Sequence, residues 1–571
     1  MKRLLLLLVL AVVSAAGPVT FSGSASLDGE QEFIGNVQGD TLRSPYSQLT
    51  FSLNPTLTVY GFPISFNFLL SSMEDNLKQA LNKYRMYLDP EYLLQSSLNL
   101  SWLAPSIKGV EVGSCNPSWS DLTLSGASVL GGAVEFNPWY IYTAAAVGRT
   151  QRAVEPSDTT DAAFSQMLYA VKLGGGKKEG THFYLTGMYA SDDSGSLTNV
   201  LQPSGPPDTI IENGDTTIVQ DSLDVVTPEE NYVLGAELNL SFWDGALGLL
   251  SEAAVSEFTR DNRMEVMEYD WLPGWVSSTF KPRLSSSIDF AYRVKPTLNV
   301  LDTRLYGEVS MVGPGYRSLG APNLRNDYLA FGGGISRSFI DNQVSASAAF
   351  TRERDNISVA NDSLGNPIQT KGLTTWFTSY SFDLGLAFTG IPYLQLGYYP
   401  YTQENDSTKD QTQMFTAGAG YDFMTGTLSH SPGVSFSYQK TTSTTEGASG
   451  TVFDVGLFHS VGFEIPLSLS AGFGFGQQNY PDTTGDQIEN NYFADVTPSY
   501  TLFGVWSNSL TLGWASDAGG NSYDVRLSSS FPIWKIADAN VGVEQSFFRG
   551  SDSLSSSYDD LRLTAGLSKS W

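Results

Sequence analysis

The segment Tyr558-Asp-Asp-Leu-Arg-Leu-Thr-Ala-Gly-Leu-Ser-Lys-Ser-Trp571 carries the pattern that decides the fold. From Leu561 onward, residues of one parity are polar or small, and the other parity carries Leu561, Leu563, Ala565, Leu567 and Trp571, with Lys569 as its polar exception. Because a β-strand directs alternate side chains to opposite faces, this segment predicts a strand with one apolar face. Such a strand suits the wall of a membrane β-barrel or a half-buried strand of a soluble sandwich.

The same alternation recurs along the chain. Leu467–Gly476 alternates large apolar residues with Ser and Gly, and Trp376–Phe388 and Leu284–Val294 each place aromatic and aliphatic residues on one face. Aromatic residues fall near the ends of these segments, as the interfacial girdles of a membrane barrel require. These segments therefore favour many amphipathic strands of similar length.

The connections between these segments alternate in length, which favours a membrane barrel over a sandwich. Short connections are expected at Gly61–Pro63, Asn137–Pro138, Trp243–Gly245, Lys295–Thr297, Ile340–Asn342, Gly390–Pro392, Glu464–Pro466, Gly504–Ser507 and Pro532–Trp534. Long polar connections are expected near 72–90, 115–128, 150–162, 191–230, 258–281, 313–325, 354–372, 403–411, 440–450, 477–491 and 548–557. Outer-membrane barrels place short turns on the periplasmic side and long loops outside. The pattern predicts an all-β, antiparallel up-and-down transmembrane barrel of about 26 strands, within a range of about 24–28.

The N-terminal residues read as an export signal. Met1-Lys2-Arg3 is basic, Leu4–Val13 is apolar, and Ser14-Ala15-Ala16 supplies small residues for cleavage. We expect a signal peptide over 1–16 and one outer-membrane barrel domain over 17–571, with both termini of the barrel on the periplasmic side. Residues 18–38 suit either one bent strand or two, and the terminal strand is expected to pair with the first strand near Gln31–Gln38.

The composition agrees with a barrel and argues against several partners. Charged residues make up 16% of the chain and aromatic residues 12%, while soluble domains average about 25% charged residues. The single cysteine, Cys115, excludes an internal disulfide. The formal net charge of −27 argues against nucleic acid as a partner and predicts an acidic extracellular face.

Three of the expected long loops carry further patterns. Met73–Tyr87 has a helical pattern and predicts a helix within its loop. The loop 191–230 is rich in carboxylates, which predicts a solvated acidic loop or, less favoured, a Ca²⁺ site, and its apolar patches would allow it to fold into the lumen. The loop 258–281 carries Tyr269, Trp271, Trp275 and Phe280, which suit a girdle or a sugar or protein contact.

Charged residues on the polar face of the strands are the candidate lumen-lining residues. They are Glu237, Asp289, Arg293, Asp302, Arg304, Glu308, Asp383, Glu464, Asp524, Arg526 and Glu544. Either these charges form ion pairs between neighbouring strands or they form a ring that selects solutes by charge. The first alternative is favoured, because no cluster is denser than a polar lumen needs.

The residue types needed for catalysis are sparse. The only histidines are His182, His430 and His459, which lie far apart in the sequence. No nucleophile elbow, phosphate-binding loop or metal motif is present, so neither an enzyme nor a bound cofactor is expected. A barrel hydrolase would depend on one of these histidines.

Two stretches resemble a family of uncharacterised outer-membrane β-barrel proteins of Gram-negative bacteria. They are Trp119–Pro138 continuing through Gly148–Val154, and Tyr60–Leu70. The resemblance covers the N-terminal third of the chain and implies the location and fold without any catalytic or binding residue. The terminal strand also resembles the C-terminal signature of outer-membrane barrels, although Lys569 stands where an apolar residue is usual. That resemblance implies recognition of Leu563, Leu567 and Trp571 by the barrel-assembly machinery.

The sequence thus predicts a porin-like channel for small solutes that contacts outer-membrane lipid. The alternative is a barrel that serves as the membrane platform of a larger secretion or attachment assembly, with its lumen filled by its own loops or by a partner.

Overall fold

The computed structural model describes most of the chain. The described residues are 19–38, 46–59, 62–73, 79, 81–88, 106–156, 162–178, 180–197, 208–212, 215–219, 226–267, 282–357, 374–405, 407–445, 449–482, 485–534, 536–551 and 557–571. The expected signal peptide lies outside them. Within the described residues, no helix is long and apolar enough to cross a membrane.

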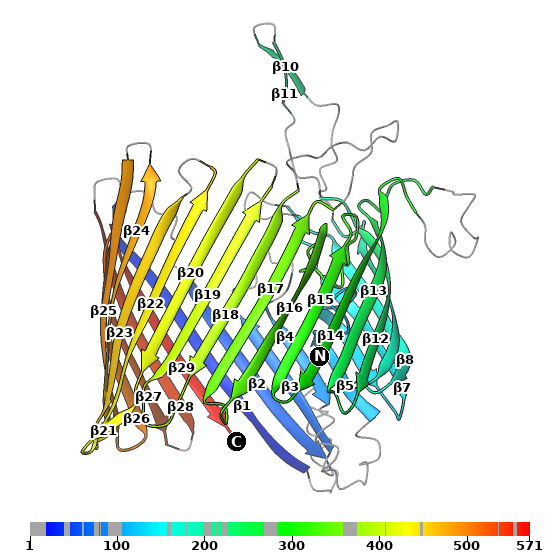
Figure 1. Ribbon diagram of the computed structural model, residues 1–571. Helices are drawn as coiled ribbons and strands as arrows, with labels where there is room; N and C mark the ends of the chain where they lie inside the picture. The colour runs from blue at the N-terminus through cyan, green and yellow to red at the C-terminus, as the bar shows by residue number, and fades with distance from the viewer. Residues whose placement is uncertain are drawn as a thin grey trace.

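The described strands form one closed antiparallel sheet and one separate hairpin (Figure 1). The first part of the sheet contains β1 (Val19–Gln38), β2 (Ser47–Val59), β3 (Phe62–Ser71), β4 (Lys83–Leu88), β5 (Ile107–Cys115), β6 (Val129–Phe136), β7 (Ile141–Gln151), β8 (Ser165–Gly176), β9 (His182–Asp193), β12 (Glu230–Phe242), β13 (Leu247–Thr259), β14 (Ser286–Val300) and β15 (Thr303–Val312). The second part contains β16 (Tyr328–Phe339), β17 (Val344–Asp355), β18 (Trp376–Leu386), β19 (Tyr393–Glu404), β20 (Lys409–Gly420), β21 (Phe423–Thr425), β22 (Leu428–Ser443), β23 (Gly450–Gly462), β24 (Leu467–Asp482), β25 (Gly485–Leu502), β26 (Trp506–Asp517), β27 (Gly520–Ile533), β28 (Ala537–Gly550) and β29 (Ser557–Ser570). The hairpin is β10 (Asp208–Glu212) with β11 (Asp215–Val219).

The sheet contains 27 strands that occupy 26 positions in the barrel wall. The short β21 follows β20 after two residues, and both pair with β22, so together they form one position. Each other strand pairs with the next wall strand along the chain, and β1 pairs with β29. The predicted closed, antiparallel barrel with an even number of strands is therefore confirmed.

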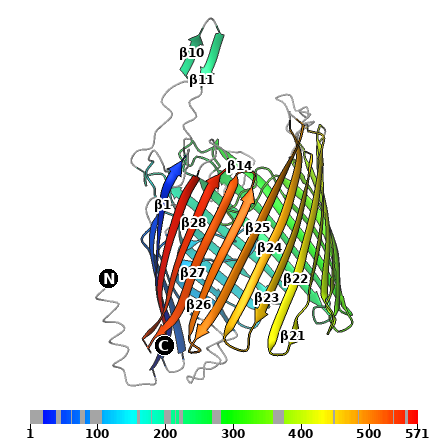
Figure 2. The same cartoon turned by 90° about the vertical axis from the view of Figure 1, so that its left-hand side faces the viewer.

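The barrel closes between its first and last strands, which lie side by side in Figure 2. The register runs from Ser24 opposite Ser570 to Gln38 opposite Ser557, and it includes the expected Gln31–Gln38 segment. Backbone hydrogen bonds of 3.0 Å join Gly23 and Trp571 in both directions. Residues 19–38 form one strand, which settles the alternative that the sequence left open.

Two of the expected connections are wrong. The turn placed at Lys295–Thr297 lies instead at Leu301 and Asp302, whose φ values of 49° and 60° suit a two-residue hairpin. Pro296 sits inside β14, where the pairing with β15 skips from Val294 to Thr297 because proline has no N–H to donate. The loop expected at 477–491 is mostly strand, since β24 and β25 pair as far as Asp482 and Gly485.

The predicted helix Met73–Tyr87 is also wrong at its C-terminal end. Lys83 to Tyr87 belong to β4, which pairs with β3 and β5. Residues 74–78 and 80 lie outside the described part of the chain. Pairing with two neighbouring strands satisfies more backbone groups than an isolated helical turn does, which overrides the local helical pattern.

The two faces of the wall differ sharply in polarity and packing. On β9 and β12, Leu185 and Leu234 are 53% and 58% exposed on the outer face, whereas Tyr184 and Val233 are each 1% exposed on the inner face. Such an apolar exterior on a closed barrel is the construction of transmembrane β-barrels, in which lipid covers the outer side chains. The packed core of the protein thus lies inside the barrel, against the inner faces of β7–β15.

Candidate functional site

Among the described residues, the interior of the barrel has a packed side and a polar side. The packed side contains the segment between β5 and β6, residues 116–128, which we call the lumen loop. Its central turn is closed by hydrogen bonds from the Leu124 N–H to the Ser120 carbonyl at 3.1 Å and from the Trp119 N–H to the Leu124 carbonyl at 2.9 Å. Leu122 and Leu124 are 1% and 0% exposed, so apolar burial holds this turn inside the barrel.

Charged groups of the wall anchor the lumen loop. Lys172 on β8 donates to the Trp119 carbonyl at 2.7 Å. Arg293 on β14 forms an ion pair with Asp121 of the loop. Both wall residues are on the inner face, so the lumen loop is fixed across the interior by two cations from different strands.

A second segment, residues 313–327 between β15 and β16, covers the lumen loop, and we call it the covering loop. The Tyr316 hydroxyl donates to the Leu122 carbonyl at 2.6 Å, and the Ser318 hydroxyl donates to the Thr123 carbonyl at 2.6 Å. The Ser125 N–H donates to the Gly320 carbonyl at 2.8 Å. Burial raises the pKa of the Tyr316 hydroxyl, so it remains a protonated donor. The two loops therefore form one interlocked body.

A compact charged cluster lies beneath this body. Glu237 on β12 accepts from Lys172 at 2.7 Å and lies 2.7 Å from His182 Nε2. The His182 ring stacks on Tyr184 at 4.1 Å, and Tyr184 stacks on Tyr142 at 4.3 Å. Glu237 thus serves as the counter-charge of a buried cation, which is a structural use of a lumen-facing carboxylate.

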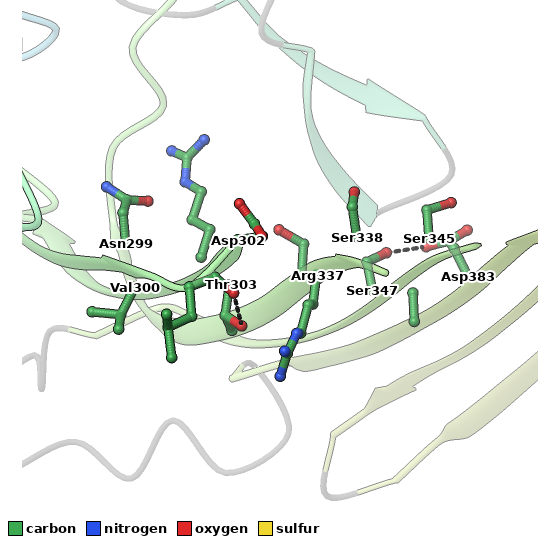
Figure 3. A pocket seen from close by; sticks show the side chains of 13 residues that line it. Asn299, Val300, Asp302, Thr303, Arg337, Ser338, Ser345, Ser347 and Asp383 are labelled. Atoms are coloured by element: carbon green, nitrogen blue, oxygen red, sulfur yellow. Dashed lines mark hydrogen bonds between the residues drawn. The ribbon is translucent and has the colours of Figure 1, made fainter. Parts of the chain in front are cut away.

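On the polar side, a hollow of about 500 Å³ lies near the turn between β14 and β15 (Figure 3). In Figure 3 Asn299, Asp302, Ser338 and Ser345 point to one side of the wall, and Val300 and Arg337 point to the other. Asp383 accepts from the Ser347 hydroxyl at 3.0 Å and from the Tyr399 hydroxyl at 2.5 Å. The lining of the hollow combines hydroxyls, carboxylates, Arg304 and Arg337 with the apolar residues Val300, Leu301 and Ala346.

One row of directly paired residues continues this polar surface around the lumen. Directly opposed residues in a sheet lie on the same face, so the row identifies the inner side of each strand. The row passes through Arg304, Ser336, Ser347, Asp383, Gly397, Thr416, Ser437, Asp454, Gly476 and Asn491. Hydroxyl groups also contact one another across strands on this polar lumen surface, as in Ser460–Ser470 at 2.7 Å and Ser509–Ser528 at 2.6 Å.

Near the seam, charges of opposite sign alternate from strand to strand. Arg526 on β27 pairs with Glu544 on β28, and Arg562 on β29 lies 3.2 Å from Glu30 on β1. The register places Arg526, Glu544 and Arg562 directly opposite one another in turn. These charges are arranged as neighbouring pairs rather than as a ring.

The structure brings several of the predicted lumen residues together. Arg293 lies 3.2 Å from Glu308 and 3.6 Å from Glu252, in addition to its contact with Asp121. Asp289 accepts from the Gly315 N–H at 2.8 Å and so holds the covering loop. Asp524 accepts from Ser546 at 2.5 Å.

Two of the predicted lumen residues are not on strands. Asp302 lies in the turn after β14, with Leu301 beside it, and Glu464 lies in the turn between β23 and β24. Their placement on strand faces is therefore wrong, whereas the connection expected at Glu464–Pro466 is confirmed. A turn changes the direction of the side chains, so parity along the sequence no longer identifies the face.

Several residues of the interior were missed. They are Asp121, Lys172, Glu252, Arg562, Glu30 and the apolar residues of the lumen loop. A signal was present in the loop, because Trp119, Leu122 and Leu124 are apolar residues in a connection that should be polar if it were solvated. The ion pair of Asp121 with Arg293 carried no local signal, because the two residues are 172 positions apart in the sequence.

The three histidines do not meet at one site. His182 belongs to the packed interior, while His430 and His459 approach within 3.4 Å on the outer face, where His430 also stacks on Phe423 at 4.9 Å. In the described part of the chain, no three His, Cys, Asp or Glu side chains are placed to hold a metal ion. Most of the acidic loop 191–230 and the aromatic residues Tyr269, Trp271, Trp275 and Phe280 lie outside the described residues or have undescribed side chains. The described β10–β11 hairpin stands beyond the rim (Figures 1 and 2).

Comparison with known proteins gives only distant structural likenesses. No family model matches the sequence, and no curated protein matches it. OccAB4 of Acinetobacter baumannii has a TM-score of 0.28 and 12% identity, over 64% of this chain and 95% of its own. OccK1 (OpdK) of Pseudomonas aeruginosa has a TM-score of 0.27 and 12% identity, over 60% and 93%. The P pilus usher (PapC) translocation pore has a TM-score of 0.27 and 11% identity, over 96% and 99%. These likenesses are too low to support an inference about this chain.

Proposed function

We propose that this protein is a channel of the bacterial outer membrane that passes small polar solutes. The observation that carries the proposal is the division of the interior, in which the two interlocked loops occupy one side and a continuous polar wall faces them. Barrels of 16–18 strands already leave an aqueous channel, so a 26-strand wall encloses more space than these loops occupy.

The polar wall is suited to passage rather than to tight binding. Several of its hydroxyls are paired across strands, and Ser, Thr and Gly recur among the residues that line its hollows, beside aliphatic and aromatic residues. A solute can exchange its water hydrogen bonds for these groups at little cost, and conduction requires that no single contact be strong. We place the short turns of the barrel on the periplasmic side of the membrane. With this orientation both termini are periplasmic, and the acidic long loops form the extracellular face.

Planar-bilayer recording of the refolded full chain tests the channel. We expect stepwise K⁺ conductance that persists at low voltage, because the interlocked loops are fixed and leave the polar side open. A bilayer that stays sealed at every voltage, with protein shown to be inserted, would overturn the proposal.

The packed side of the interior favours a second candidate, a membrane platform for a larger assembly. On this alternative the lumen is closed further by a partner, and the interlocked loops provide part of the plug. Extraction in mild detergent followed by size measurement distinguishes the two. A stoichiometric partner together with a sealed bilayer would favour the platform, whereas a lone conducting barrel would contradict it.

A further inference from the structure

The middle of β24 presents an unusual surface to the lumen. Gly472, Gly474 and Gly476 occupy its inner face, and the alternate residues Phe473 and Phe475 face outward. Gly476 lies directly opposite Asp454, in the row of paired residues that lines the lumen. The three glycines leave a track of bare backbone that neighbouring side chains can cover.

An aromatic ring and two carboxylates cover this track in alternation. The Phe493 ring lies over Gly474, where a Cβ would overlap it. A Cβ on Gly472 would lie 2.5 Å from Asp495 Oδ1, and a Cβ on Gly476 would overlap the Asn491 amide and lie 2.5 Å from Asp454 Oδ1. Phe493 is nevertheless 49% exposed, so one face of the ring is open to the lumen between two carboxylates.

The surrounding wall supplies no positive charge. Among the described residues of β16–β26, the lumen-facing positions contain no Lys or Arg, and their carboxylates include Asp383, Asp454 and Asp495. A second aromatic ring, Phe458 on β23, is 46% exposed and lies over Gly433 of β22. The paired strands place the two rings roughly 10 Å apart across the sheet.

We propose that Phe493, Asp495 and Asp454 form a binding patch for organic cations on the lumen wall. An ammonium group over the face of an aromatic ring is attracted by the ring quadrupole, and the flanking carboxylates add to this attraction. The patch would select substituted amines over anionic solutes. This inference rests on the proposed channel function and names a class of solute for it.

The packing of the Phe493 ring over Gly474 also has a structural role, because an aromatic side chain on a neighbouring strand compensates for the missing side chain of a strand glycine. That role needs only the inner face of the Phe493 ring and neither carboxylate. The variant Phe493→Leu keeps an apolar cover over Gly474 and removes the aromatic face, so it separates the two roles.

The test uses choline as the probe and the refolded full chain in planar bilayers. Choline is expected to block the K⁺ current in a saturable way. Phe493→Leu is expected to raise the half-blocking concentration about fivefold, within the range of a single cation–aromatic contact. Asp495→Asn is expected to raise it as well and serves as a second variant that retains the ring. Phe473→Leu, a lipid-facing change on the adjacent strand with 46% exposure, is the matched control and should leave the block unchanged.

Three outcomes would overturn the inference. The first is a choline block that is the same in Phe493→Leu and Asp495→Asn as in the unaltered chain. The second is an absence of choline block in a conducting channel. The third is a block by neutral maltose that is equally sensitive to Phe493→Leu, which would assign the patch to saccharides. If the protein conducts no K⁺, the channel proposal fails, and choline binding to the detergent-refolded barrel by calorimetry still tests the patch.

Discussion

At the scale of single residues, Arg293 joins the wall to the lumen loop through several carboxylates. It contacts Asp121 of the loop together with Glu252 and Glu308 of neighbouring strands. Glu252 is only 7% exposed, so its charge depends on the guanidinium for compensation. The planar guanidinium presents five N–H donors in a fixed fork, which suits it to contact with several carboxylates at once.

We expect Arg293→Met to destabilise the barrel by about 3 kcal/mol, because it leaves a buried carboxylate without a counter-charge. The measurement is the urea midpoint of unfolding in lipid vesicles, followed by heat-modifiable gel mobility. Arg526→Met is the matched control, since Arg526 is 57% exposed beside Glu544 and its loss should cost less than about 1 kcal/mol. Equal effects of the two changes would contradict the central role of Arg293.

Tyr316 gives the interlocked loops a dependence on pH. Burial raises the pKa of its hydroxyl above the unfolded value, and the Glu252 charge acts in the same direction. A raised pKa means that the folded state holds the proton more tightly than the unfolded state does. The stability from this group is therefore complete below about pH 10 and is lost as the pH rises above it.

We expect Tyr316→Phe to lower stability at neutral pH by about 1 kcal/mol, through loss of the hydrogen bond to the Leu122 carbonyl. The difference in stability between the unaltered chain and Tyr316→Phe should become smaller between about pH 10 and pH 11. The measurement is the difference in unfolding midpoint between the two chains across this range. Tyr140→Phe, at a residue that is 67% exposed, is the control and should show no such convergence.

At the scale of elements, the lumen loop behaves as part of the core rather than as a connection. Ordinary loops run over the surface because their backbone polar groups need water. Here the covering loop and Lys172 supply those partners, and the buried Leu122 and Leu124 supply apolar contact. The β10–β11 hairpin, by contrast, forms its own two-stranded sheet away from the wall.

Replacement of residues 119–125 with a Gly-Ser linker of equal length is expected to increase single-channel conductance. The change removes the side chains of the lumen loop from the interlocked body, leaves the covering loop without its partner and keeps every pairing of the wall in place. Stability should fall as well, since each buried Leu contributes about 1.5–3 kcal/mol. The control replaces residues 208–219 with such a linker and should leave the conductance unchanged. An unaltered conductance in the first variant would show that the lumen loop does not limit the pore.

At the scale of the whole molecule, strand parity separates a lipid face from a lumen face around the entire barrel. On β27, Leu527 faces outward and is 48% exposed, whereas the adjacent Ser528 faces inward and contacts Ser509. Lipid cannot solvate a charge on the outer face, whereas water in the lumen can solvate one on the inner face.

We therefore expect Leu527→Arg to cost about 2–4 kcal/mol near the bilayer midplane and Ser528→Arg to cost far less. Urea unfolding in vesicles of the two single variants gives the comparison, and each serves as the control for the other. A larger loss for Ser528→Arg would mean that the two faces have been assigned in reverse.

The sequence by itself predicted the antiparallel barrel wall, a strand number near 26 and, within most strands, which residues share a face. The period of two along each strand and the alternation of connection lengths are local properties, so the residues of Leu561–Trp571 indicate both the strand and its apolar side. Only the tertiary structure decided how the interior is filled. The contacts between Asp121 and Arg293 and between Tyr316 and Leu122 join segments more than 170 residues apart, and no local period records such a pairing. The proposed binding patch beside β24 could not be predicted from the sequence for the same reason. The strand glycines are covered by a ring and two carboxylates only because neighbouring strands place those side chains over them.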